Sequence, residues 1–324
     1  MPFPMLPLPA PGEVLLVNTC YEDDGTPLWD AILQTVGGRR DGDLLVLGDD
    51  AEGKGDDKRG GDDNLRLRLT ANPDWDYLHG GDFPALLPPG FDAPVIAQAD
   101  ISAVYGNDNL MLIDLREVPG RGVRVPTAEL VRVLTGLHDG TISFDELIRG
   151  MDLCGTYLGD AGEPTNPTPT GVVRTSFPPL PGYPLTLLVR TDFENHEGWN
   201  SLLSALGDLD EDNDTQVDFG DTGSAGLGLS ARVVDDPAFE SLQPGQVPAL
   251  VPTVGRNDQH TTMVALADAR TLADPVHRLL VVDLYDTPGQ SIRIPLAGAG
   301  SLAANLEIAN MDFYEFENYE GWNG

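Results

Sequence analysis

The sequence predicts an α/β (α+β) protein with two tandem homologous domains, each a mixed β-sheet with flanking helices. The first observation is a duplication: "LMLIDLREVPGRGVRVP" at residues 110–126 recurs as "LLVVDLYDTPGQSIRIP" at residues 279–295. The second is that short apolar runs alternate with amphipathic segments in the same order in each half, which is typical of layered α/β domains. The third is length, because halves of about 160 residues are each large enough for a core of their own.

The duplication also sets the domain boundaries. Beyond the longest match, "PAPGEVLLVNT" answers "PLPGYPLTLLVRT" and "ISFDEL" answers "MDFYEF". We therefore expect a first domain over residues 1–160 and a second over residues 161–324, with a turn-rich linker at about residues 159–176. The proline-rich opening, residues 1–12, has an echo before the second copy. We expect it to belong to the fold as an extended segment on the surface.

Each half is expected to begin with a buried strand and an amphipathic helix. The strands are "EVLLVN" and "LTLLVRT". The helices are anchored by Trp29 and Leu33 in the first half and by Trp199, Leu202 and Leu203 in the second. One or two strands around an acidic loop follow: "LLVLG" and "LRLRLT", then "LGLSARVV" in the second half.

The later elements also follow one order in both halves. Helical turns open at the "NP" of residues 72–73 and the "DP" of residues 236–237. Two further strands, "PVIAQAD" with "LMLIDL" and "TTMVALAD" with "LLVVDL", flank a connection of about ten residues, so the sheet is expected to be mixed. A final helix opens at an N-cap followed by an acidic third helical position, the pairs being Ser143 with Glu146 and Asp312 with Glu315.

The composition is strongly acidic in both halves. Nineteen Lys and Arg residues stand against 52 Asp and Glu, which gives a net charge of −33, about −16 for residues 1–160 and −17 for the rest. Direct nucleic-acid binding needs clustered basic residues and is disfavoured, and an anionic membrane would repel the chain. A basic protein partner is favoured. Alternatively, the acidity and the presence of only two lysines reflect a GC-rich genome or a salt-adapted host.

The sequence gives no sign of membrane insertion or export. No segment approaches the roughly 20 apolar residues of a membrane span. The N-terminal residues lack the basic start and unbroken apolar run of a signal peptide. Cys20 and Cys154 do not correspond between the copies, which argues against a disulfide scaffold. We therefore expect a cytoplasmic protein.

No catalytic motif is repeated in both halves. The sequence lacks a G-x-S-x-G nucleophile elbow, a phosphate-binding G-x-x-x-x-G-K-[ST] and an H-E-x-x-H. The glycines of "GDTGSAGLGLS" indicate a flexible loop rather than a dinucleotide fingerprint. No histidine has a counterpart in the other copy, and we expect all of them to be surface or loop residues: His79, His138, His196, His260 and His277.

One candidate site is a duplicated set of aspartates at the ends of predicted strands. Asp100 and Asp114 correspond to Asp268 and Asp283. Open α/β sheets carry ligand clefts at strand ends, and paired carboxylates there can act as acid and base or hold a metal. The structural alternative is that each aspartate caps the following turn and pairs with a duplicated arginine. These arginines are Arg124 and Arg293.

The second candidate is the run "DEDNDTQVDFGD" at residues 210–221. It places aspartates at the first, third, fifth, ninth and twelfth positions of a calcium-binding loop, where a hard cation finds six or more oxygen ligands. Thr215 occupies the position that favours glycine for the sharp turn. The alternative is a solvated acidic loop. The candidate ligands are Asp210, Asp212, Asp214, Asp218 and Asp221.

Several segments of the second copy carry a family resemblance. "LLVRTDF", "VVDDPAFESL", "LLVVDLYDTPG" and "NLEIANMDFYEF" resemble an uncharacterised domain-of-unknown-function family of actinobacterial proteins, over most of residues 185–316. The first copy is a diverged relative that keeps "IDLREVPG" and "ISFDEL". The resemblance implies a GC-rich bacterial host and the same domain boundaries, and it implies no activity.

Two classes of function follow. The first is a non-catalytic acidic binding protein that engages a basic protein partner, as immunity proteins, inhibitors and assembly adaptors do, and that works without a cofactor. The second is an enzyme that uses the strand-end aspartates, with or without a divalent metal. Duplication favours binding, because two similar modules can hold one partner by avidity. The sequence does not indicate an oligomeric state.

Overall fold

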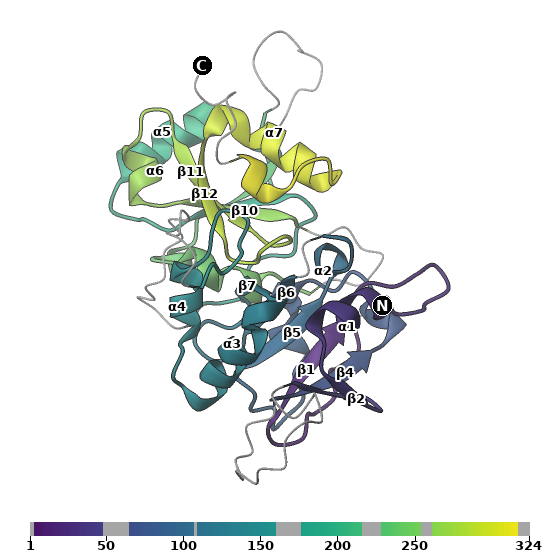
Figure 1. The fold of residues 1–324 in the computed structure, drawn as a ribbon. Helices are drawn as coiled ribbons and strands as arrows, with labels where there is room; N and C mark the ends of the chain where they lie inside the picture. Colours follow the sequence, from purple (N-terminus) through teal and green to yellow (C-terminus); the bar gives the residue numbers. More distant parts are fainter. Residues whose placement is uncertain are drawn as a thin grey trace. The chain divides into compact units, whose positions relative to one another are not determined.

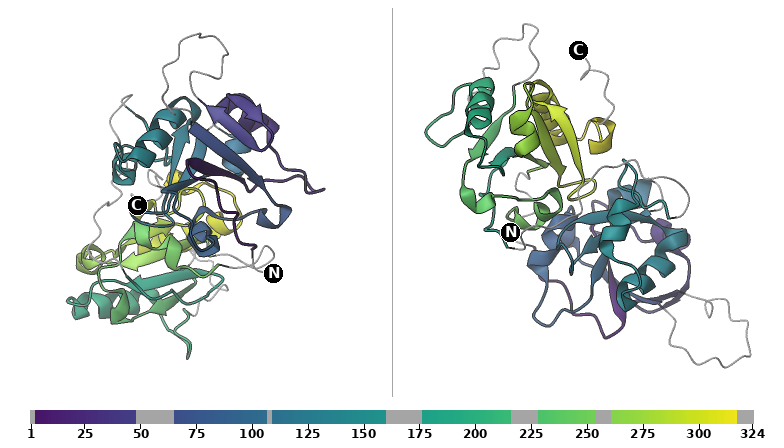
Figure 2. Two further views of the ribbon diagram at one scale, coloured as in Figure 1. Left: turned by 90° about the horizontal axis from the view of Figure 1, so that it is seen from below. Right: turned by 90° about the vertical axis from the view of Figure 1, so that its left-hand side faces the viewer.

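The chain is built as two compact units. The computed structural model describes residues 3–47, 65–106, 109–159, 176–215, 228–253 and 261–316. One unit comprises Met1–Thr165 with Thr253–Asn257, and the other comprises Asn166–Pro252 with Asp258–Gly324. Each unit has its own β-sheet, with helices packed against it (Figures 1 and 2). No helix among the described residues is both long enough and apolar enough to cross a membrane.

The first unit contains a seven-stranded mixed sheet in the order β2-β3-β4-β1-β5-β6-β7. The central strand β1 is parallel to both of its neighbours, β4 and β5, and all other pairs are antiparallel. The strands are β1 (Glu13–Asn18), β2 (Arg39–Asp41), β3 (Leu44–Leu47), β4 (Leu65–Ala71), β5 (Val95–Ala99), β6 (Asn109–Asp114) and β7 (Gly122–Pro126).

Alternate residues of these strands point to opposite faces of the sheet, and both faces are buried. On one face, Leu16 packs in a core with helix side chains such as Leu134 and Phe144. The helices are α1 (Asp30–Val36), α2 (Ile101–Tyr105), α3 (Thr127–Asp139) and α4 (Phe144–Arg149). On the other face, Leu15 packs with Trp75 and residues of two 3₁₀ segments, η2 (Pro73–Trp75) and η3 (Gly80–Leu86).

The second unit contains a five-stranded sheet in the order β12-β11-β10-β8-β9. Strand β8 is parallel to β10 and β9, whereas β10, β11 and β12 pair antiparallel. The strands are β8 (Thr186–Arg190), β9 (Ala231–Val234), β10 (Met263–Ala267), β11 (Arg278–Asp283) and β12 (Ser291–Pro295).

The second sheet is also covered on both faces. One core joins Leu188 to Trp199, Leu302 and Phe313, and the other joins Leu187 to residues of the 3₁₀ turns. The helical segments are α5 (His196–Leu206), η4 (Pro237–Phe239), η5 (Pro244–Gln246), η6 (Pro248–Leu250), α6 (Ala269–Ala273), α7 (Leu296–Glu307) and η7 (Phe313–Phe316).

The two units repeat one order of elements, including an unusual backbone position. Tyr77 and Ser241, which correspond, have φ values of 61° and 65°. Their amides donate to the carbonyls of Thr19 and Thr191, at 3.1 and 2.9 Å. Among the described residues the first unit differs by its added hairpin of β2 and β3. The predicted pair of mixed-sheet α/β domains is confirmed.

The proline-rich opening belongs to the first unit, as its echo in the second copy predicts. Phe3 and Leu6 are buried in the core on the 3₁₀ face of the sheet. The amide of Leu6 donates to the carbonyl of Leu86 at 2.9 Å, and Leu180 makes the same contact to Leu250 at 2.8 Å in the second unit. The expected linker, residues 159–176, lies almost entirely outside the described residues.

Candidate functional site

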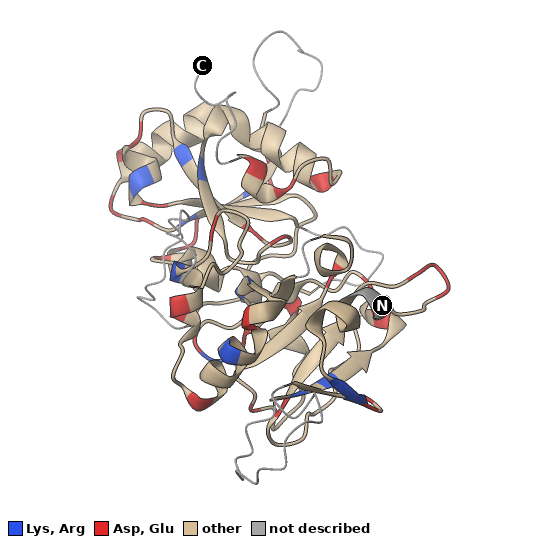
Figure 3. Ribbon diagram, in the orientation of Figure 1, with Lys and Arg blue, Asp and Glu red and all other residues tan. Residues whose placement is uncertain are grey.

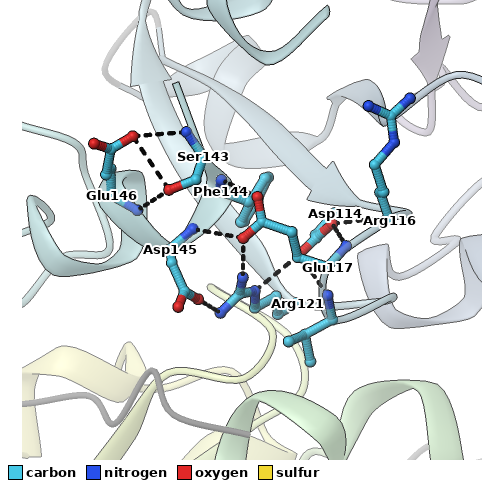
Figure 4. Close-up of polar contacts among 9 residues, drawn as sticks. Asp114, Arg116, Glu117, Arg121, Ser143, Phe144, Asp145 and Glu146 are labelled. Atoms are coloured by element: carbon cyan, nitrogen blue, oxygen red, sulfur yellow. Dashed lines mark hydrogen bonds and ion pairs between the residues drawn. The ribbon is translucent and has the colours of Figure 1, made fainter. Parts of the chain in front are cut away.

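Asp114, at the end of β6, fixes the turn that follows it (Figure 4). Its side chain is buried, and one carboxylate oxygen accepts hydrogen bonds from the amides of Arg116 and Glu117, both at 2.9 Å. The other oxygen accepts from the amide of Val118 at 2.8 Å. Gly120 then adopts φ 96°, which a residue with a side chain rarely adopts. The carboxylate therefore organises a Pro-Gly turn.

Arg121 joins this turn to helix α4 (Figure 4). Its guanidinium is 3% exposed and contacts Asp114 at 3.0 Å, Glu117 at 3.3 Å and Asp145 at 2.7 Å. It also lies 5.3 Å from the ring centroid of Phe144. Three carboxylates around one buried cation satisfy its charge and donors, so the cluster is a structural tie.

Helix α4 begins at this cluster with the predicted cap. The Ser143 hydroxyl accepts a hydrogen bond from the Glu146 amide at 3.2 Å, and the Glu146 carboxylate accepts one from the Ser143 amide at 2.7 Å. Glu117 adds acceptors for the next two amides, those of Phe144 at 2.8 Å and Asp145 at 3.1 Å. Four otherwise unpaired amide groups at the helix start are thereby satisfied by side chains of two segments.

The second copy keeps the turn and loses the cation. Asp283 accepts hydrogen bonds from the amides of Tyr285, Asp286 and Thr287, and Asp286 accepts one from the Phe313 amide at 2.7 Å. The position of Arg121 is occupied by Gln290. Asp283 therefore forms no ion pair within the described residues. Burial, reinforced by the charge of Asp286, raises the pKa of Asp283 to about 7.

The other two duplicated aspartates cap short helices and bind arginines. Asp100 accepts from the Ala103 amide at 2.9 Å, and Arg124 donates to its two oxygens at 3.2 and 2.8 Å. Asp268 and Arg293 form the same pair in the second unit. Burial would raise the pKa of Asp268, but hydrogen bonds from Arg293 and from Thr271 outweigh it and the pKa is lowered.

The structure does not bring the two aspartates of a copy together. Asp100 follows the carboxyl end of β5, whereas Asp114 lies opposite Val95 at the amino end of the same strand. In the second unit Asp283 pairs with Met263 at the amino end of β10. Each copy therefore holds two separate carboxylates at opposite edges of its sheet, with no shared acid–base pair.

The acidic run at residues 210–221 begins as a tight turn. Asp210 accepts hydrogen bonds from the amides of Asp212 at 2.8 Å and Asp214 at 2.9 Å. Both oxygens of Asp214 accept from Arg232, at 2.7 and 3.0 Å. Within the described segments no three His, Cys, Asp or Glu side chains gather as a metal site. Asp218 and Asp221 lie outside the described residues, so the structure does not test the calcium-binding alternative over its full length.

Two polar clusters of the second unit were not predicted from the sequence, because their residues do not form a motif that recurs in the first copy. Arg190, at the end of β8, donates to Asp235 at 3.2 Å and lies 4.5 and 5.2 Å from the ring centroids of Phe193 and Trp199. His277 lies in the loop between α6 and β11, in line with the expected surface or loop position, and its side chain is buried. Its Nε2 lies 3.0 Å from the hydroxyl of Ser201 on helix α5.

Exposed acidic groups gather where the parallel strands of the first unit end. The turn after β1 projects from the unit (Figure 3). The Tyr21 hydroxyl accepts a hydrogen bond from the Asn72 amide at 2.7 Å and so ties this turn to η2. We name the exposed residues of the two segments the acidic edge: Glu22, Asp23, Asp24, Asp74 and Tyr77.

The corresponding edge of the second unit is acidic as well. Glu194 and Glu197 follow β8, and Asp236 follows β9; all three are exposed. These positions lie at the carboxyl ends of parallel strands, which is the edge where open α/β sheets place their binding residues. Both copies therefore present negative charge at the same place in the fold.

Comparisons with known proteins give one match. The family model for a domain of unknown function, DUF6924, matches residues 13–160 and again residues 185–324. No curated protein and no solved structure matched the chain. The two matched regions cover most of the chain and coincide with the two sheets. The protein therefore belongs to the DUF6924 family and carries two copies of its domain in tandem.

Proposed function

We propose that this protein is a non-catalytic binding protein that engages a basic protein partner, as an immunity protein, inhibitor or assembly adaptor. We further propose that it acts in the bacterial cytoplasm. The cytoplasm keeps thiols reduced, and the chain's two cysteines, Cys20 and Cys154, form no disulfide. The proposal includes no cofactor, no direct contact with nucleic acid and no membrane association.

The observation that carries this proposal is where the charges lie. Most arginines of the described segments form ion pairs with the chain's own carboxylates, so their positive charge is neutralised locally. With a net charge of −33, the remaining surface is anionic and favours fast association with a cationic surface. The arginines in internal ion pairs are Arg39, Arg68, Arg121, Arg124, Arg132, Arg190, Arg232, Arg278 and Arg293.

The acidic edge is the surface that suits such a partner best. Tyr77 is 56% exposed and belongs to the same two segments as the four carboxylates, and an edge that combines an aromatic ring with negative charge favours lysine and arginine side chains. The second unit repeats the acidic character at the same edge. Two such edges on one chain support binding by avidity, because the second contact forms at a high effective concentration.

The alternative function, an enzyme that uses strand-end aspartates, has less support. Acid–base catalysis needs two groups within reach of one substrate, and the aspartates of each copy lie at opposite edges of the sheet. Asp283 is the best remaining candidate, since its pKa is raised to about 7. Turnover of a substrate that is lost in a folded Asp283→Asn variant would favour the enzyme.

The experiment that tests the proposal is affinity purification from the native host with three forms of the full chain. The first is the natural sequence, and the second carries Glu22→Gln and Asp23→Asn in the acidic edge. The third carries Asp41→Asn and Asp43→Asn, which remove two exposed charges from the β2–β3 hairpin as a matched control.

We expect the natural protein and the control to retain the same partner, with an excess of Lys and Arg, while the acidic-edge variant retains less of it. The binding must then be reproduced with purified components. Retention of an acidic partner, or equal retention of a basic partner by all three forms, would contradict the proposed surface.

A further inference from the structure

The second unit contains a cavity of about 150 Å³ between helix α7 and the amino-terminal ends of its three parallel strands. Strand β8 contributes Thr186, and Ser230 and Thr262 immediately precede β9 and β10. Helix α7 contributes one face of small residues, including Gly300 and Ala303, and ends at Glu307 on the cavity wall.

The duplication explains why this space is open. In the first unit the corresponding positions carry Val14, Val131 and Leu134, where the second has Thr186, Gly300 and Ala303. Val14 and Leu134 are buried in the first core, and Val131 packs against it. The same helix and strand therefore enclose a filled core in one copy and a hollow in the other. An empty hollow loses packing contacts, which a bound molecule restores.

The polar groups of the cavity supply a second and independent observation. The hydroxyls of Thr186, Ser230 and Thr262 form no hydrogen bond to any other described residue. Thr186 is only 5% exposed, and it lies on the same strand face as Leu188, which packs in the core with α7. The Thr186 side chain is thus almost entirely buried, while its hydroxyl lines the cavity and has a free hydrogen-bonding capacity that a ligand there would use.

We propose that this cavity binds a small organic molecule with an apolar body and a hydroxyl or amine group. A cavity of this volume accommodates a six-membered aromatic ring. The three hydroxyls donate to or accept from the polar group of the ligand. Glu307 on the wall and the acidic surface of the chain disfavour an anion, so the ligand is neutral or cationic.

The test measures binding of three probes to the full chain by ligand-observed NMR and by titration calorimetry: benzyl alcohol, benzylamine and benzoate. We expect saturable binding of the alcohol and the amine in the millimolar range or tighter, and none of benzoate. Ala303→Leu, which restores the side chain found at Leu134, should abolish binding. Ala128→Leu, at an exposed position of α3, makes the same change in the first unit and should leave binding intact.

Thr186→Val provides a second variant that keeps the volume of the side chain. It restores the residue type of Val14 and removes one hydroxyl, so we expect benzyl alcohol to bind roughly tenfold more weakly. The proposal is overturned if no probe binds, which would leave a cavity occupied by water only, or if binding persists unchanged in both Ala303→Leu and Thr186→Val.

Discussion

The replacement of Arg121 by Gln290 in the second copy predicts that the second domain loses stability as the pH rises through the neutral range. Both copies bury an aspartate in the same turn, and within the described residues Asp114 has a guanidinium beside it whereas Asp283 has none. Among the described residues, the charged neighbour that acts on Asp283 is Asp286 of the same loop, and no arginine or lysine pairs with Asp283. The unfolded chain releases the Asp283 proton near pH 3.8, whereas the folded domain holds it to about pH 7.

The direction and the size of the stability change follow from this difference in the Asp283 pKa between the folded and unfolded states. Between these two pH values the folded state binds more protons than the unfolded state, so the free energy of unfolding falls as pH rises. At 1.36 kcal/mol per pKa unit, the total loss attributable to Asp283 is about 4 kcal/mol. About 2 kcal/mol of it falls between pH 5.5 and pH 7.5, which is about a 25-fold change in the opening equilibrium.

Hydrogen exchange followed by mass spectrometry measures this effect locally. We expect the peptide that spans residues 283–290 to be about 25-fold less protected at pH 7.5 than at pH 5.5, after correction for the intrinsic exchange rate. The peptide that spans residues 114–121 is the internal control. Gln290→Arg should remove the pH dependence from the second copy, and Arg121→Gln should introduce one in the first.

Two results would refute the reasoning. One is equal protection of residues 283–290 at both pH values. The other is a pH dependence that Gln290→Arg leaves unchanged in a folded protein. The first result would show that the Asp283 carboxylate is ionised in the folded state and stabilised by its backbone hydrogen bonds. The second would show that another group causes the pH dependence.

Three further outcomes can be measured by thermal or denaturant unfolding. Ser143→Ala should lower the free energy of unfolding of the first domain by about 1 kcal/mol, because helix α4 loses its capping box; an unchanged value would mean that Glu117 suffices as the cap. Arg124→Ala should lower the free energy of unfolding of the first domain by about 2 kcal/mol, because Asp100 then loses two charge-assisted hydrogen bonds. A decrease below about 0.5 kcal/mol would contradict a structural role for the pair. Millimolar calcium should leave the melting temperature unchanged, because Asp214 is held by Arg232; a rise that disappears in Asp212→Ala would instead establish the calcium site.

The sequence predicted the architecture well because the duplication doubles each local signal. The strand at residues 110–114 and its counterpart at residues 279–283 carry the same apolar run and the same terminal aspartate, and both became antiparallel strands of mixed sheets. The capping residues Ser143 and Glu146 were also predicted, since a capping box depends on residues three positions apart.

The candidate site was less predictable, because its geometry depends on strand direction. Asp100 and Asp114 both end strands in the sequence, yet β5 and β6 run in opposite directions and place them at opposite sheet edges. The contact of Ser201 with His277 and the cavity beside α7 depend on residues from separate elements of one copy. Neither leaves a motif of fixed spacing, and the cavity becomes visible only when Ala303 is compared with Leu134.

The measurement that tests the central claim most directly is the association rate constant with the identified partner as a function of salt. We predict that the rate falls by roughly tenfold or more between low and high ionic strength, because exposed charges are screened beyond about 8 Å at physiological salt. The Glu22→Gln, Asp23→Asn variant should associate more slowly at low salt than the Asp41→Asn, Asp43→Asn control. A rate that does not depend on salt and is equal in the two variants would contradict an acidic binding protein.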